Sequence, residues 1–238
     1  MTCQKVVSPI VANNPKQPSV ILIHGLYQKD WAMRPLAHRL KQLGFVPYLY
    51  HYDSLKSPLS AHSQRLLRFI NHAGLDRTHI IAHSLGGLVV RQFLLDHPAI
   101  QLGRIVTLGT PHQGSTVAHY VKRLIPTLIG QVYHNALDGR LPDHQTSPNV
   151  ELGVIAGSKA VGIGQPFLSH YHKKHPTNDS LHDGTVLVSE TRLSWAKDHI
   201  IVPASHTGML LDLTVAKHSA YFLEHGCFDS SSHQDSTK

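Results

Sequence analysis

The stretch His79-Ile80-Ile81-Ala82-His83-Ser84-Leu85-Gly86-Gly87-Leu88-Val89-Val90 decides how the rest of the chain is interpreted. A short apolar run typical of a strand leads into a corner at Ser84, and a second apolar run typical of a helix follows. A sharp turn of this kind exposes a serine hydroxyl where a base can take its proton. The residues two before and two after that serine must be small, and here they are Ala82 and Gly86. The stretch predicts a nucleophile; a serine that only caps an ordinary helix is the alternative.

Strand-like and helix-like segments alternate around this corner. This alternation predicts an α/β fold with a mostly parallel central sheet and helices on both faces. The predicted strands cover residues 19–23, 46–50, 79–83, 104–108, 150–156 and 185–189. The predicted helices cover about residues 31–43, 61–72, 86–96 and 211–225.

The alternation is interrupted once, by residues 114–148. This segment contains an amphipathic stretch over 119–132, broken by Pro126, and a polar loop over 138–148. In a sheet of this kind such an insertion lies over the strand ends, so we expect a short cap above the site. The whole chain, 1–238, is predicted to be one domain with a core of about 19–225 and a disordered polar tail at 230–238.

Composition excludes several classes of protein. No apolar run reaches the length of a membrane span, and the start of the chain lacks the features of a secretory signal, so a cytoplasmic protein is expected. The net charge of +7 would favour peripheral contact with anionic lipid surfaces, but no basic run with interleaved aromatic residues predicts nucleic-acid binding. Cys3 and Cys227 are expected to be free thiols, with a bridge between the termini as the alternative.

A nucleophilic serine needs a base and a group that orients the base. His206 precedes the last helix, and Asp183 stands beside Gly184 next to a predicted strand. These two positions set them apart from the other histidines and from the rival acids Asp179 and Asp198, so we expect His206 to be the base and Asp183 to orient it.

An oxyanion hole is expected from two backbone N–H groups, those of Leu26 and Leu85. Gly25 would let the backbone come close to the substrate, and His24 would shape the same loop through a hydrogen bond. Three further residues are assigned to the pocket or its support: Tyr27 follows this loop, His83 is expected to point away from the serine oxygen, and His112 lines the pocket or sits in a loop.

The histidines of Ser169-His170-Tyr171-His172-Lys173-Lys174-His175-Pro176 have a spacing that could bind zinc or nickel. The two lysines oppose a cation, and no acid or cysteine joins them locally. We therefore expect an exposed, solvated loop there and no metal site.

Taken together, the motifs resemble those of the α/β-hydrolases, and in particular the small triacylglycerol-lipase and esterase group. The resemblance covers about residues 19–225, and the order Ser84, Asp183, His206 is the order found in that superfamily. The motifs that carry it are HGL at 24–26, AHSLGG at 82–87, TLGTPHQGS at 107–115, DGTVLVS at 183–189 and SHTGML at 205–210. The chain departs from the pattern at Ala82 and in its short cap.

The resemblance implies an esterase or lipase that cleaves carboxylic esters through an acyl-serine, without metal or cofactor. A small ester or a lipid would then be the substrate, and the protein is not expected to insert stably into a membrane. Two other interpretations stay open: an acyltransferase or thioesterase with the same three residues, and a binding protein that keeps the fold without catalysis. The sequence leaves the oligomeric state open.

Overall fold

The computed structural model describes residues 17–124, 136–144, 149–174 and 180–229. Its centre is a six-stranded sheet with the strand order β2-β1-β3-β4-β5-β6, and all neighbouring strands are parallel. The strands are Ser19–Ile23 (β1), Val46–Tyr50 (β2), His79–His83 (β3), Ile105–Leu108 (β4), Leu152–Gly157 (β5) and Asp198–Val202 (β6). The predicted mostly parallel sheet is confirmed.

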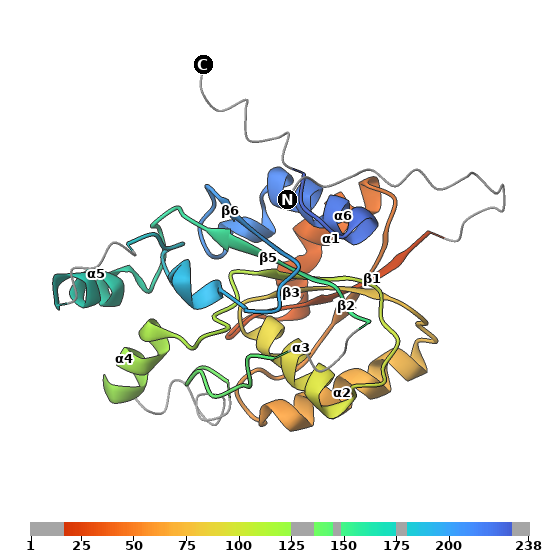
Figure 1. Cartoon of the computed structure of the whole chain (residues 1–238), viewed down its shortest axis with the longest axis horizontal. Helices are drawn as coiled ribbons and strands as arrows, with labels where there is room; N and C mark the ends of the chain where they lie inside the picture. Colours follow the sequence, from red (N-terminus) through yellow and green to blue (C-terminus); the bar gives the residue numbers. More distant parts are fainter. Residues whose placement is uncertain (1–16, 125–135, 145–148, 175–179, 230–238) are drawn as a thin grey trace, which may run out of the picture.

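Helices cover both faces of this sheet, as Figure 1 shows. The α-helices are Arg34–Gln42 (α1), Leu59–His72 (α2), Leu85–Asp96 (α3), Thr116–Leu124 (α4), Gln165–Lys174 (α5) and Leu213–His225 (α6). The described residues also form short 3-10 turns at Asp30–Met33 (η1), Ser189–Thr191 (η4) and Gly208–Leu210 (η5).

The hydrophobic core lies in two layers because successive strand residues point to opposite faces. In β3, Ile80 and Ala82 pack with residues of α2 and α3, whereas Ile81 packs with residues of α1 and α6. A strand that is buried on both faces is apolar throughout, which explains the continuous apolar runs in the sequence. The carboxyl ends of the parallel strands meet at one edge, and the loops that follow them are therefore neighbours.

The pair α4 and α5 stands apart from the two helical layers, on the left in Figure 1. The predicted cap, 114–148, includes α4, and its described part is tied to the core by Arg91 of α3. The buried guanidinium of Arg91 donates to the backbone oxygens of His112, Leu141 and Pro142. The part of the predicted amphipathic stretch 119–132 that follows Leu124 lies outside the described residues. Residues 145–148 of the predicted polar loop also lie outside them.

The strand predicted at 185–189 is wrong. This segment is a loop with one isolated bridge between His182 and Leu187, and the sixth strand is β6, at 198–202. The reason is local: the Asp183 carboxylate accepts the N–H groups of Thr185 and Val186, so these are not available to a strand ladder.

Two other expectations also fail. The residues 169–174, predicted as a solvated loop, belong to α5, which packs against α4. Cys227 is disulfide-bonded and not a free thiol, while Cys3 lies outside the described residues. Among the described helices, none has both the length and the apolar character needed to cross a membrane.

Candidate active site

Ser84 occupies the corner between β3 and α3. Its backbone has φ 54° and ψ −122°, a conformation that an L-residue adopts only under constraint. Gly86 makes the corner possible, because a Cβ there would lie 2.8 Å from the carbonyl oxygens of both Ile23 and His24. Ala82 is fully buried in the core layer under α2 and α3, so the methyl group in place of the usual glycine is accommodated.

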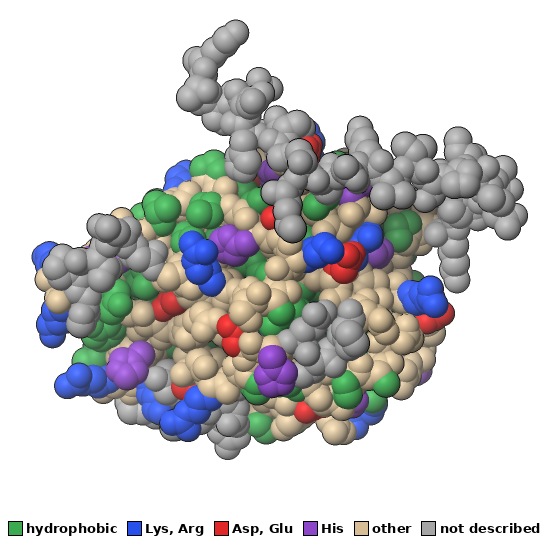
Figure 2. Space-filling view, viewed as in Figure 1, with side chains coloured by type: hydrophobic (Ala, Val, Ile, Leu, Met, Phe, Trp, Pro, Cys, Tyr) green, Lys and Arg blue, Asp and Glu red, His purple; other side chains and the backbone are tan. Residues whose placement is uncertain are grey.

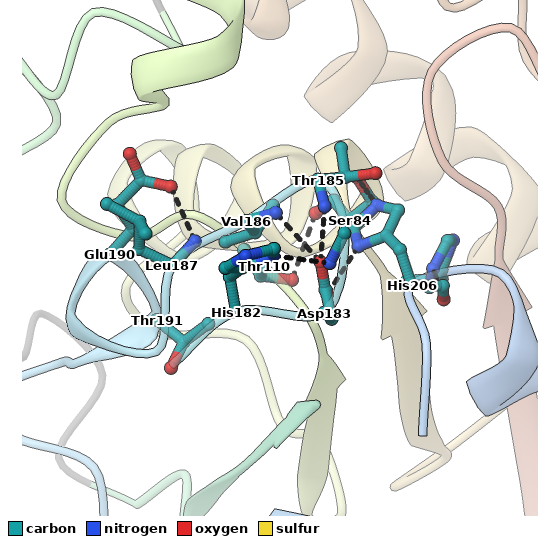
Figure 3. Close-up of polar contacts among 12 residues, drawn as sticks. Ser84, Thr110, His182, Asp183, Thr185, Val186, Leu187, Glu190, Thr191 and His206 are labelled. Carbon is teal, nitrogen blue, oxygen red and sulfur yellow. Dashed lines mark hydrogen bonds and ion pairs between the residues drawn. The ribbon is translucent and has the colours of Figure 1, made fainter. Parts of the chain in front are cut away.

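The structure brings Ser84, Asp183 and His206 together from three loops (Figure 3). His206 Nε2 lies 2.9 Å from Ser84 Oγ, and His206 Nδ1 lies 2.6 Å from Asp183 Oδ2. Nδ1 carries the proton that it donates to the carboxylate, so the lone pair of Nε2 faces the serine hydroxyl. This is the arrangement in which a histidine can accept a proton from serine.

Asp183 is held firmly on its other side. Its Oδ1 accepts the N–H groups of Thr185 at 2.9 Å and Val186 at 2.7 Å, and only 1% of the residue is exposed. The rival Asp198 instead accepts backbone N–H groups of His199 and Phe228, so it caps local structure. The other rival, Asp179, lies outside the described residues.

His83 connects the elbow to the loop that carries His206. Its ring is buried, and Nε2 donates to the carbonyl oxygen of His206 at 2.9 Å. Burial, and next the charge that His206 would carry, lower the pKa of His83 to about 3. A neutral imidazole therefore holds the backbone of His206 in place.

The loop that contains Leu26 faces the start of α3. Leu85 is the first residue of α3, so its N–H has no acceptor within the helix, and both leucines line the same cavity as Ser84. Gly25 packs so tightly that a Cβ would lie 3.0 Å from both His83 Nδ1 and Ser84 Cβ.

Gln28, which sequence reasoning missed, holds the Leu26 loop. Its Oε1 accepts the N–H of Gly25 at 2.9 Å and lies 3.2 Å from His83 Nδ1. Only its position four residues after His24, in the same loop, could have indicated this role.

The substitution Gln28→Ala is expected to lower ester turnover about tenfold with little change in KM. Removal of an entire oxyanion donor costs about 10²- to 10³-fold in kcat, and this change only loosens the loop that carries the predicted donor, the N–H of Leu26. Steady-state kinetics measures the effect. Gln92→Ala, which removes a side-chain bond to Asp96 on α3, is the matched control and should leave turnover unchanged. Equal losses in the two variants would contradict the assignment.

The three remaining predicted residues differ in their placement. His24 is fully buried, stacks on Tyr52 with ring centroids 4.4 Å apart, and contacts the Gly25 oxygen through Nδ1 at 2.9 Å. It supports the Leu26 loop and does not line the cavity. Tyr27 lines the cavity and is 54% exposed. His112 is buried beside Thr107, 3.1 Å from its hydroxyl, and does not line the cavity.

A cavity of about 300 Å³ opens beside Ser84 and His206. One wall is formed by Val117, Ala118 and Val121 of α4. The other apolar residues that line it are Leu26, Tyr27, Leu85, Pro111, Leu137, Val161, Ile163 and Val186. An apolar cavity that ends at a polar cluster is suited to a substrate with a hydrocarbon part and one reactive polar group.

The described residues contain no group of three or more histidine, cysteine or acidic side chains that could hold a metal ion. His170 and His172 lie on α5, and His175 lies outside the described part of the chain. On the face shown in Figure 2, the histidines are scattered.

Two residues after β4 also shape the site, although sequence reasoning gave them no role. Thr110 donates its hydroxyl to the Ser84 carbonyl oxygen at 2.9 Å. Gly109 has φ 55°, and a Cβ there would lie 3.0 Å from Asp183 Oδ2 and 3.1 Å from His206 Nδ1. Their place directly after a strand, at the edge where the other site residues gather, was the available signal.

No family model matches the chain. The structure is similar to a mature Bacillus licheniformis lipase (TM-score 0.70, 18% identity, 91% of this chain and 95% of that chain). It is also similar to a metagenomic carboxyl esterase (TM-score 0.67, 14% identity, 93% and 79%). A third similar structure is an extracellular α/β-hydrolase from a Paenibacillus species (TM-score 0.54, 16% identity, 90% and 100%). The chain therefore has the α/β-hydrolase fold, as predicted.

A probable alcohol acetyltransferase of Cyberlindnera fabianii is among the curated proteins that are similar in sequence. The two are 25% identical over 134 residues, which cover 52% of this chain and 36% of that protein. The chain thus matches only about a third of that relative's length.

Proposed function

We propose that the protein is a serine hydrolase that cleaves carboxylic esters. The observation that carries this proposal is the line of contacts from Asp183 through His206 to Ser84 Oγ, beside an apolar cavity. The fold supports it, since the similar structures include a lipase and a carboxyl esterase.

The geometry supports a two-stage mechanism. His206 Nε2 takes the hydroxyl proton as Ser84 Oγ attacks the ester carbonyl, and Asp183 stabilises the imidazolium that forms. The N–H groups of Leu26 and Leu85 bind the oxyanion. His206 then gives its proton to the leaving alcohol, and an acyl-serine remains. Water, activated by His206, releases the acid by the same route.

The cavity wall on α4 supports an acyl chain as the occupant. Val121 lines the cavity and is half-buried, so it can be enlarged with limited damage to the core. Val121→Trp is expected to lower kcat/KM for octanoyl esters at least about tenfold relative to acetyl esters, because each methylene that no longer fits costs about tenfold or more.

The p-nitrophenyl esters from acetyl to palmitoyl measure this preference. The exposed residue Val46, at the start of β2, offers a matched control, and Val46→Trp should leave the chain-length profile unchanged. An unchanged profile in Val121→Trp would place the acyl chain elsewhere.

Acyl transfer to an alcohol is the second candidate, because the curated relative is a probable alcohol acetyltransferase. The same acyl-serine would then react with an alcohol in place of water. Adding a primary alcohol to the ester assay separates the two functions, since a transferase forms mainly the new ester and a hydrolase mainly the acid.

The first experiment combines the ester series with labelling by a serine-directed fluorophosphonate. Turnover and labelling, both lost in Ser84→Ala, are the expected result. A folded protein that neither turns over an ester nor reacts with the probe would favour the binding-protein interpretation.

A further inference from the structure

Glu190 is a buried carboxylate that the proposed mechanism does not use. It lies in η4 and is 8% exposed. Its Oε1 accepts the N–H of Thr116 at 2.5 Å, and its Oε2 accepts the N–H of Leu187 at 3.0 Å. One carboxylate therefore joins two segments that are far apart in the sequence.

The first of these segments is the loop that carries Asp183. Three successive N–H groups point to two carboxylates: those of Thr185 and Val186 bond to Asp183, and that of Leu187 bonds to Glu190 (Figure 3). A displacement of Leu187 would therefore be passed directly to the groups that hold Asp183.

The second segment is the wall of the cavity. Thr116 is the first residue of α4, and Val117, Ala118 and Val121 of the same helix line the cavity. An N–H at the start of a helix has no acceptor within the helix, and a negative charge is favourable there. Glu190 thus fixes the end of α4 from which the wall begins.

The position requires a carboxylate with two oxygens. Burial raises the pKa of Glu190, the bonds from Thr116 and Leu187 lower it, and the charge of Asp183 raises it slightly, so that the pKa lies at about 7. Burying such a charge is costly. A glutamine would have only one acceptor oxygen for two N–H groups, and an aspartate is one methylene too short to span them.

Building on the proposed ester hydrolysis, we propose that Glu190 is a positioning residue that couples the cavity wall on α4 to the orientation of Asp183. An acyl chain that packs against α4 steadies the Asp183 loop through this carboxylate. Long acyl groups then raise kcat and do not only lower KM.

Three variants separate the parts of this proposal. Glu190→Asp keeps the charge but loses the reach, and Glu190→Gln keeps the size but loses one acceptor. Thr116→Pro removes the N–H and the hydroxyl of Thr116, both of which bond to Glu190, at the first position of a helix, where proline is tolerated. Glu224, on the exposed side of α6, gives the matched controls Glu224→Asp and Glu224→Gln.

The ratio of kcat for octanoyl and acetyl esters is the first measurement. We expect this ratio to fall about two- to thirtyfold in all three variants and to stay unchanged in the controls. A role confined to folding would lower thermal stability and reduce kcat by the same factor for every ester. An effect of charge alone would leave Glu190→Asp like the wild type. Either result would overturn the proposal.

A second measurement does not depend on turnover. The proton between His206 Nδ1 and Asp183 gives a strongly deshielded ¹H NMR signal. Its chemical shift moves upfield as the hydrogen bond between the two residues lengthens and weakens. Both Glu190 variants should move this signal upfield, and Thr116→Pro, which leaves the Leu187 bond intact, should not. If the wild type hydrolyses no ester, the proposed function fails, and the chemical shift of this proton alone tests the coupling. An unchanged chemical shift in both Glu190 variants would refute the coupling.

Discussion

Ser84→Ala is expected to lower kcat for p-nitrophenyl ester hydrolysis by about 10⁴- to 10⁶-fold. Without Oγ no acyl-serine forms, and only the oxyanion donors and the cavity continue to act on the ester. The substitution removes one oxygen from a residue whose backbone is fixed by the elbow, so the fold should be kept. Circular dichroism and the thermal midpoint verify this.

The matched control for this prediction is Ser60→Ala on the exposed side of α2, which should retain full activity. Labelling by the fluorophosphonate should disappear in Ser84→Ala alone. Retention of more than a small fraction of wild-type turnover in Ser84→Ala would falsify the assignment of the nucleophile.

Asp183→Asn is expected to lower kcat about 10⁴-fold near neutral pH. The geometry explains the size of this loss. Thr185 and Val186 both donate to the inner position of the side chain, so the amide oxygen of asparagine must take that place. Its NH₂ group then faces His206 Nδ1, which becomes an acceptor, and the ring proton moves to Nε2. In that tautomer His206 cannot take the proton of Ser84.

Asp198→Asn tests the same chemical change at the rival acid. Asp198 accepts backbone N–H groups near β6, so this variant should lose some stability and keep its kcat. Stopped-flow or steady-state kinetics on the two variants decides between the acids. A larger loss of kcat in Asp198→Asn than in Asp183→Asn would reverse the assignment.

The sequence predicted the central part of the fold well. The runs at 19–23, 46–50 and 79–83 are strands with those bounds. The first and third are buried almost throughout, and a strand that is buried on both faces needs continuous apolar residues. The serine, aspartate and histidine could be selected because each had a local context, such as a corner of small residues or a position before the last helix. The structure places all three within hydrogen-bond distance of their neighbours in this line. Their catalytic role stays a prediction.

The elements that were missed depend on contacts between distant segments. β6 begins with Asp198 and His199, and its pairing with β5 gives it the strand conformation. α5 carries few apolar residues at helical spacing, and its packing against α4 stabilises it. The role of Gln28 follows from one backbone N–H in its own loop, and that of Glu190 follows from the N–H groups of Thr116 and Leu187, which no simple sequence pattern encodes.

The order of the strands gives the site two unequal halves. Ser84 follows β3 in the middle of the sheet, whereas His206 follows β6, which pairs with β5 alone at the edge. Edge strands open locally at lower free energy than the centre of a sheet. Fraying of a single strand could thus separate base from nucleophile while most of the molecule stays native. The hydrogen bond from His83 to the His206 carbonyl oxygen opposes this separation, because it joins the loop after the edge strand β6 to the end of the central strand β3.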